Sequence, residues 1–322
     1  MARIFVNAHF EYADGDDINE AGDGSIWPVN VHTSLPRQTG ENTTLSLTAT
    51  QAFSQNLSLT IGKFNLVEAA NNTPLVGGAD GGGFNYLGFV APPSFVAPPY
   101  ALGGQIALTT QPINYSLLVY DSRSAQGHEF WEHPFQGLVY NASATFKTKF
   151  ANLPGFYTIN YVHSTAEGID FKSLLFEPGT AGFASTIRGY DYAAFKFQQY
   201  LYTDHTNPGN GWGIFGQVAV GDNNPHPYGF AYNIGIGGNS PFADREQDRW
   251  GVAFSKQHWS NEFVDGLAAI GTFIEDETAI EAFYEAAITE NLRVGVNVQY
   301  INPGVVGFDD AVLVGTRARF VF

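Results

Sequence analysis

The side chains that could carry out catalysis are few, and their spacing does not suit it. His128 and His133 flank two glutamates but are five residues apart, whereas the helix of a zinc protease places its two histidines four apart. Glu281 and Glu285, on one face of an extended strand, would lie roughly 13 Å from each other. Carboxyl pairs of glycoside hydrolases are only ~5–9.5 Å apart. We therefore interpret the histidines as a surface cluster and expect no glycosidase chemistry.

Motifs for nucleotide binding, nucleophilic catalysis and thiolate metal sites are also missing from the sequence. The glycine-rich stretch 77–83 lacks the Lys-Ser/Thr ending of a phosphate-binding loop, and no Gly-x-Ser-x-Gly nucleophile turn occurs. Because the chain has no cysteine, neither a disulfide nor a thiolate metal site can form. We expect a protein that is not an enzyme and that needs no cofactor or metal.

Polar residues instead recur at every second position, as the C-terminal residues illustrate. Between Val312 and Phe322, apolar side chains and one threonine fall on one face of an extended strand. Arg317 and Arg319 fall on the other face, which suits water if the first face contacts lipid. Alternation of this kind, ending on an aromatic residue, is typical of outer-membrane β-barrels.

The composition agrees with a membrane barrel and excludes several other classes of protein. Aromatic residues make up 15% of the 322 residues and charged residues only 14%, against a usual charged fraction of about 25%. No stretch approaches the ~18 consecutive apolar residues of a spanning helix. A net charge of -16 argues against a nucleic-acid partner. A soluble β-sandwich, or two in tandem, is the alternative that composition leaves open.

Period-two segments bounded by Gly, Pro, Asn and Asp recur along the whole chain. The clearest is 292–300, where four apolar residues and a tyrosine alternate with polar residues and glycine. A helix is the competing prediction only at 278–289, where Ala and Glu dominate. Even there, the alternation of side chains between two faces still favours a strand. The fourteen predicted strands are 3–12, 43–53, 57–65, 101–110, 113–121, 137–149, 155–164, 190–202, 211–222, 228–238, 248–257, 278–289, 292–301 and 311–322.

The connections between these strands alternate in length, which is the second feature of a membrane barrel. We predict a single domain over 1–322, an all-β transmembrane antiparallel up-and-down β-barrel of about 14 strands. Short turns should lie at the periplasmic rim and long loops outside. The long loops are 13–42, 66–100, 122–136, 165–189, 258–277 and 302–310.

Loop 66–100 is long, rich in glycine at 77–83, and carries two Pro-Pro pairs among aromatic residues. A loop of this length inside a compact domain is generally functional or disordered. Its aromatic and proline content favours packing, and in a barrel the available interior is the lumen. We therefore expect loop 66–100 to fold into the pore.

With the strands placed, seven segments stand out: Leu57–Leu66, Leu153–Ser164, Gln199–Tyr202, Gly211–Phe230, Asp248–Phe254, Glu281–Gly304 and Gly315–Phe322. Each segment alone is weakly specific, but together they cover nearly the whole chain. In this order they resemble the carbohydrate-selective porin family (OprB-type) of Gram-negative outer membranes.

The resemblance implies a passive channel for sugars such as glucose, located in the outer membrane. It also implies that the barrel-insertion machinery reads the terminal Phe322, so that Phe322→Asp should impair assembly. Family members resemble barrels of about sixteen strands. This chain supplies fourteen and has no export signal before its first strand. It is therefore expected either to be a short member or to lack a leading hairpin. Outer-membrane lipid, lipopolysaccharide and copies of itself in a homotrimer are further expected partners.

The alternation of side chains along the strands assigns most of the basic residues to the face that lines the lumen. Lys63 and Lys256 have the wrong parity but lie near strand ends, where a bulge or a side chain reaching for water would accommodate them. The eight basic residues on the polar face are Arg3, Lys147, Lys149, Lys196, Arg249, Arg293, Arg317 and Arg319. Acidic residues are mostly in loops, where we expect solvation: Asp14, Asp16, Asp17, Glu20, Asp23, Glu129, Glu132, Glu262, Asp265, Glu275, Asp276, Glu277, Asp309 and Asp310.

We predict a porin for small sugars or polyols, because lumen donors and acceptors can replace the water around sugar hydroxyls. The candidate pore-lining residues are Lys196, Gln198, Arg249, Glu281, Arg293, Arg317 and Arg319. Structural ion pairs, such as Arg293 with Glu281 or Glu285, are the alternative role for these charges. Replacing Arg317 and Arg319 by Ala should then change ion selectivity more than folding. An anion-preferring porin and a sealed-barrel adhesin or receptor are the alternative functions.

Overall fold

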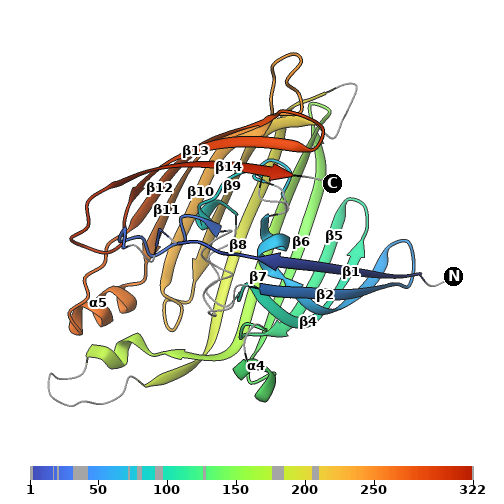
Figure 1. The fold of residues 1–322 in the computed structure, drawn as a ribbon. Helices are drawn as coiled ribbons and strands as arrows, with labels where there is room; N and C mark the ends of the chain where they lie inside the picture. The colour runs from blue at the N-terminus through green and yellow to red at the C-terminus, as the bar shows by residue number, and fades with distance from the viewer. Residues whose placement is uncertain are drawn as a thin grey trace.

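The fold is a single curved sheet whose fourteen strands pair in the order β1 to β14, each with its neighbours in the chain (Figure 1). Every pairing is antiparallel, as an up-and-down barrel wall requires. β1 and β14 form the two edges of this sheet. The computed structural model describes residues 3–16, 18–19, 22–31, 43–71, 73–77, 82–90, 97–125, 128–175, 185–204 and 210–320.

All fourteen predicted strands are present. The largest differences are at β7 and β8, which extend into the predicted loop 165–189. A register shift between Ser164 and Glu167 breaks the alternation there, so the sequence pattern ended too early. The strands are β1 Arg3–Tyr12, β2 Thr43–Ala52, β3 Leu57–Asn65, β4 Tyr100–Thr109, β5 Ile113–Asp121, β6 Leu138–Phe150, β7 Leu153–Ile169, β8 Thr186–Thr203, β9 Gly211–Gly221, β10 Tyr228–Asn239, β11 Arg249–Trp259, β12 Glu277–Ala287, β13 Leu292–Asn302 and β14 Ala311–Phe320.

The alternation in sequence becomes two chemically different faces of the wall. On β13, Val294, Val296 and Val298 are exposed, whereas Asn297 and Gln299, which alternate with them, are buried. The exposed valines belong to the outer face, which hydrocarbon covers in a membrane barrel, and the buried polar residues belong to the inner face. β12, where helix was the competing prediction, is a strand with the same alternation.

The connections contain short helices that the sequence pattern did not predict. α5 begins after Ser260, whose hydroxyl accepts a hydrogen bond from the backbone N–H of Phe263 in the usual manner of an N-cap. Among the described residues, no helix has both the length and the apolar character needed to cross a membrane. The helices are α2 Leu66–Asn71, α3 Leu87–Val90, α4 His128–Glu132, the 3₁₀ helix η1 Phe171–Leu175 and α5 Asn261–Ala269.

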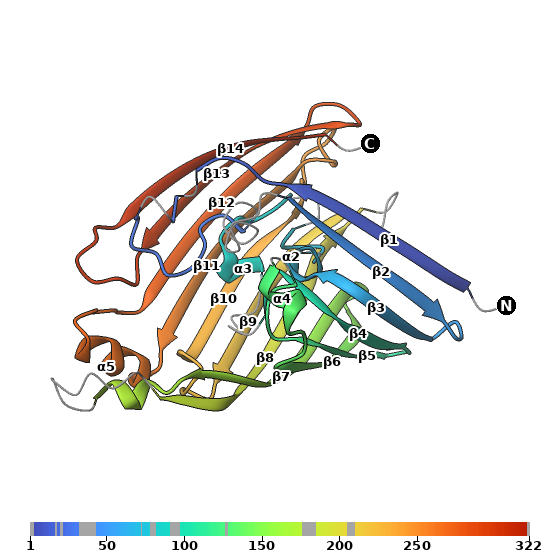
Figure 2. The same cartoon turned by 60° about the horizontal axis from the view of Figure 1, so that its bottom comes forward.

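Two loop segments lie inside the curve of the sheet. We call the described part of loop 66–100 that follows α2, residues 73–77 and 82–90, the inner loop; Figure 2 shows its helix α3 surrounded by the strands. Residues 22–31 of loop 13–42 pack beside it, and we call them the first-loop segment. Sequence analysis expected loop 13–42 to lie outside, and for residues 22–31 that expectation was wrong.

The apolar core of the molecule therefore lies within the lumen. Phe84 of the inner loop packs edge-on against Phe283 of β12, with ring centroids 4.9 Å apart, and against Phe215 of β9 at 5.5 Å. Trp27 of the first-loop segment stacks on Tyr228 at 5.4 Å. Burial of these rings, all of them less than 10% exposed, is what holds the two segments in place.

Candidate functional site

The inner face of β12 carries three fully buried glutamates, Glu277, Glu281 and Glu285, each with 0% exposure. They occur at every fourth residue, so the strand directs all three to the same side. Buried carboxylates require hydrogen-bond donors or opposite charges around them. Each glutamate receives a different set of donors, and together they connect the wall to the two inserted segments. We call these three residues the glutamate ladder.

Glu277 holds the first-loop segment. Its carboxylate accepts hydrogen bonds from the backbone N–H groups of Ile26 at 2.7 Å, Trp27 at 3.2 Å and Gly304 at 3.1 Å. The Tyr86 hydroxyl donates to it at 2.7 Å. Burial and the Glu277 charge raise the pKa of the Tyr86 phenol, so the hydroxyl remains a donor. Sequence analysis placed Glu277 in a solvated loop, and this was wrong; its spacing from Glu281 and Glu285 was the signal for its position.

Glu281 holds the inner loop. It accepts from the backbone N–H of Asn85 at 2.9 Å and of Tyr86 at 2.9 Å, and from the Gln299 side chain at 3.1 Å. The Gln299 amide nitrogen also donates to the Val29 carbonyl at 2.9 Å. Glu281 and Gln299 are paired across β12 and β13, so one polar pair binds both inserted segments.

Glu285 holds two arginines instead of backbone. Arg319 donates to both of its oxygens, from Nε at 3.1 Å and Nη2 at 2.6 Å, in the bidentate geometry of a strong ion pair. Arg317 Nε lies 3.5 Å from the same carboxylate. Arg317 also donates to the Asn85 side chain at 2.9 Å, which links this ion-pair cluster to the inner loop. A Cβ at Gly82 would lie 2.7 Å from Arg319 Nη2, so a larger residue there would make the guanidinium shift.

Two further predicted site residues bind one turn of the inner loop from a different side. Arg249 donates from Nη2 to the Pro74 carbonyl at 2.8 Å. The Gln198 side-chain oxygen accepts from the Leu75 backbone N–H at 3.1 Å. The structure thus brings Gln198, Arg249, Glu281 and Arg317 into direct contact with the inner loop.

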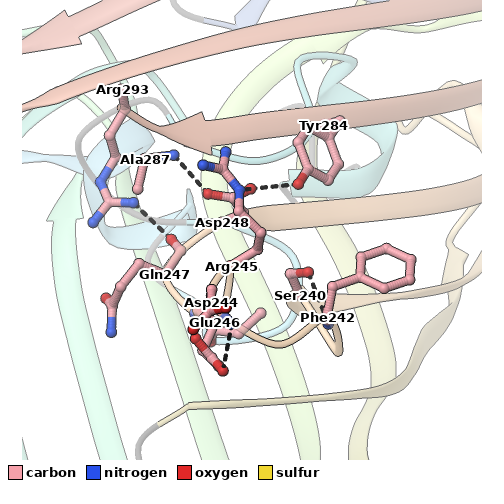
Figure 3. Close-up of polar contacts among 11 residues, drawn as sticks. Ser240, Phe242, Asp244, Arg245, Glu246, Gln247, Asp248, Tyr284, Ala287 and Arg293 are labelled. Carbon is pink, nitrogen blue, oxygen red and sulfur yellow. Dashed lines mark hydrogen bonds and ion pairs between the residues drawn. The ribbon is translucent and has the colours of Figure 1, made fainter. Parts of the chain in front are cut away.

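Arg293 lies apart from them, beside the connection 240–248 between β10 and β11 (Figure 3). It donates from Nη1 to the Gln247 carbonyl at 2.7 Å. The expected pairing of Arg293 with Glu281 or Glu285 was wrong, because the register places Arg293 opposite Ala287 and Arg319. The turn that supplies Gln247 is itself fixed by buried Asp248, which accepts from the Ala287 N–H at 2.8 Å and from Arg245 Nε at 2.7 Å.

Lys196, the remaining candidate, lies in the middle of β8 between Thr158 of β7 and Gln217 of β9 in the register. Among the described residues, no carboxylate pairs with it. Of the seven candidates, it is therefore the one whose charge is not engaged with the inner loop, the ion-pair cluster or a turn.

The two lysines of unexpected parity are accommodated differently. Lys63 follows Gly62, whose φ of 140° is open to glycine and rare for other residues, and its Nζ lies 3.3 Å from the hydroxyl of buried Thr44. Lys256 stays on the outer face and pairs with Asp276 at 3.5 Å in the following loop. Asp17, Glu20 and Phe322, as well as 72, 78–81 and 91–96 of loop 66–100, lie outside the described residues.

A family model described as "Carbohydrate-selective porin, OprB family" matches residues 14–322. The chain belongs to this family. Its fold is similar to that of Pseudomonas putida OprB at high pH, with a TM-score of 0.78 and 18% identity over 92% of this chain and 76% of that one. The low-pH structure of the same protein gives a TM-score of 0.50 at 14% identity, over 86% and 76% of the two chains.

The outer-membrane channel DcaP of Acinetobacter baumannii has the same kind of fold, with a TM-score of 0.50 and 9% identity over 100% of this chain and 97% of that one. No curated protein matches the sequence closely enough to count as a relative. The predictions of family, barrel fold and outer-membrane location are confirmed. The protein is a carbohydrate-selective porin, and its family and structural neighbours are channels and not enzymes.

Proposed function

We propose that this porin passes small sugars or polyols through a lumen narrowed by the inner loop and the first-loop segment. The observation that carries the proposal is the glutamate ladder, whose three carboxylates are buried. Glu277 and Glu281 accept hydrogen bonds from backbone N–H groups of the two inserted segments, and Glu285 pairs with the arginines of β14. A segment held by several buried hydrogen bonds stays in the lumen on the time scale of permeation and sets its width. We further propose that the seven predicted site residues shape this narrowed path, six of them by holding protein segments.

The alternative of an anion-preferring porin was motivated by the inward basic residues, and the contacts of four of them weigh against it. Arg249 and Arg293 donate to backbone carbonyls, Arg317 to the Asn85 side chain, and Arg319 to Glu285. Their hydrogen-bonding capacity is thus partly used within the protein, and Glu285 offsets one of their charges. Neutral polyhydroxylated solutes suit such a lumen better than phosphate or organic acids.

Ion currents through single channels in planar bilayers test this proposal. We expect glucose added to the bath to reduce the ion current in a concentration-dependent manner, with weak discrimination between K⁺ and Cl⁻. Binding should be weak because a pore must release what it binds. Strong anion preference without any sugar-dependent reduction of the current would contradict the carbohydrate assignment in favour of the anion porin. Absence of conductance would favour the sealed-barrel receptor.

The terminal aromatic residue is proposed as the contact with the barrel-insertion machinery. We expect Phe322→Asp to lower the amount of assembled protein in the outer membrane, because a charged residue replaces the terminal aromatic residue. Fractionation followed by detection of the heat-modifiable folded form measures the loss, and Phe320→Tyr is the matched control. Normal assembly of Phe322→Asp would refute this role. The homotrimer and the contacts with lipopolysaccharide stay predictions from the family resemblance.

A further inference from the structure

The inner face carries a continuous row of polar side chains that crosses seven neighbouring strands. Each member is the register partner of the next, so the row depends on the register in which neighbouring strands pair. Lys196 is its only charged member. The row, from β5 to β11, consists of Asn114, Thr145, Thr158, Lys196, Gln217, Asn233 and Ser255. We call it the polar row.

One end of the polar row is covered by the inner loop. Asn233 donates from its side-chain amide to the Gly88 carbonyl at 2.7 Å, and Asn233 and Ser255 are 6% and 1% exposed. A side chain at Gly88 would meet the Ser255 hydroxyl at 3.0 Å, which shows how closely the loop approaches here. No solute can reach this end without displacing the inner loop.

At its other end, the polar row joins a wall of uncharged hydroxyl and amide groups. On β2 to β7, cross-strand pairs hydrogen-bond to each other: Thr50 with Thr60 at 2.9 Å, Ser116 with Ser143 at 2.8 Å, Thr145 with Thr158 at 2.9 Å, and Asn141 with Asn160 at 2.6 Å. A hydroxyl has one donor and two acceptor positions, so each pair keeps capacity for a further partner. We call these residues the hydroxyl wall.

The inner loop leaves the hydroxyl wall free of its hydrogen bonds. Within the described residues, the hydrogen bonds of the inner loop to the wall end on Gln198 of β8, Asn233 of β10, Arg249 and Gln257 of β11, Glu277 and Glu281 of β12 and Arg317 of β14. The inserted segment is therefore held to one side of the lumen, β8 to β14, and the hydroxyl wall lies on the remaining side.

We propose that permeating sugars move along the hydroxyl wall and that Lys196, at its boundary with the inner loop, is a cation that they contact. This inference rests on the proposed function and specifies where it is carried out. The arginines of β11, β13 and β14 are committed to the inner loop, to the turn before β11 and to Glu285. The ammonium of Lys196 has three donors on a flexible stem, with Thr158 and Gln217 beside it in the register.

This arrangement explains a preference for polyhydroxylated solutes. Sugar hydroxyls can exchange water for the paired hydroxyls of the wall and then for the ammonium. Lys196, as the only charged member of the polar row, provides one charge-assisted hydrogen bond there, enough for recognition and too little to trap the solute.

Accessibility of single cysteines tests the path without any assumption about the solute, because the chain contains no native cysteine. Ser143→Cys and Lys196→Cys should react with a small, water-soluble cationic methanethiosulfonate and lose conductance. Ala279→Cys, on the inner face beside Ser255 and only 1% exposed, should be protected. Conductance before labelling shows that each variant is folded. Unreactive Lys196→Cys and Ser143→Cys, or Ala279→Cys reacting as fast as they do, would overturn the proposed path.

The role of Lys196 itself is tested by Lys196→Gln. The half-blocking concentration of glucose should rise about tenfold, as expected for the loss of one hydrogen bond to a charged group, and ion selectivity should shift towards cations. Lys149→Gln, which removes an exposed lysine from the rim end of β6, should change neither value. Block unchanged by Lys196→Gln would overturn this inference alone, whereas absence of block in the unmodified channel would contradict the proposed function itself.

Discussion

Replacing Glu281 by glutamine is expected to widen the channel. The carboxylate accepts from the backbone N–H groups of Asn85 and Tyr86 and from Gln299, and all of these groups are buried. An amide has a single acceptor oxygen and presents an N–H₂ group where the second oxygen was. At least one buried donor then loses its partner, at a cost of about 1–3 kcal/mol per group. The inner loop should leave its position for part of the time or permanently.

Two measurements reveal this release. Single-channel conductance of Glu281→Gln should exceed that of the unmodified protein, and liposome-swelling assays should detect entry of oligosaccharides that the unmodified channel excludes. Glu290→Gln makes the same chemical change at an exposed residue in the turn before β13 and should leave both values unchanged. If Glu281→Gln keeps the conductance and the size limit of the unmodified channel, the glutamate ladder does not hold the constriction.

Removing Arg317 and Arg319 together is expected to destabilise the barrel strongly. Glu285 has 0% exposure, and its cationic neighbours are these two arginines. Taking away both leaves a buried carboxylate without compensation, which typically costs about 3–5 kcal/mol. Sequence analysis predicted a change in ion selectivity larger than any effect on folding. Because the ion-pair cluster is buried, we now expect the effect on folding to be the larger one, so the urea midpoint for unfolding from detergent micelles should fall.

Adding Glu285→Gln to the double variant provides the decisive comparison. Because the buried charge is then removed as well, much of the lost stability should return, and the triple variant should unfold at higher urea than the double one. Arg293→Ala, which removes an arginine that donates to a carbonyl, should have a smaller effect than the double variant. A double variant as stable as the unmodified protein, or no recovery in the triple variant, would contradict the proposed role of the cluster.

Much of the wall was predictable from the sequence because a membrane strand carries its signal locally. Alternation along 292–300 and 311–322 assigns each side chain to lipid or lumen without reference to any other segment. The signal failed where the alternation itself is interrupted, at the register shift after Ser164. It also gave no information about α5, because a nine-residue amphipathic helix within a loop is too short to be distinguished from a turn-rich connection.

The interior was decided by tertiary structure. The alternation correctly predicted that Glu281, Arg293, Arg317 and Arg319 share a face. Their partners, however, depend on the register across strands, which places Arg293 opposite Ala287 and Arg319 and not opposite Glu281 or Glu285. The contact of Asn85 with Glu281 joins residues 196 apart in the chain, and that of Ile26 with Glu277 joins residues 251 apart. Such contacts form when loops return into the lumen and fill it, and no local period in the sequence encodes where a loop will end.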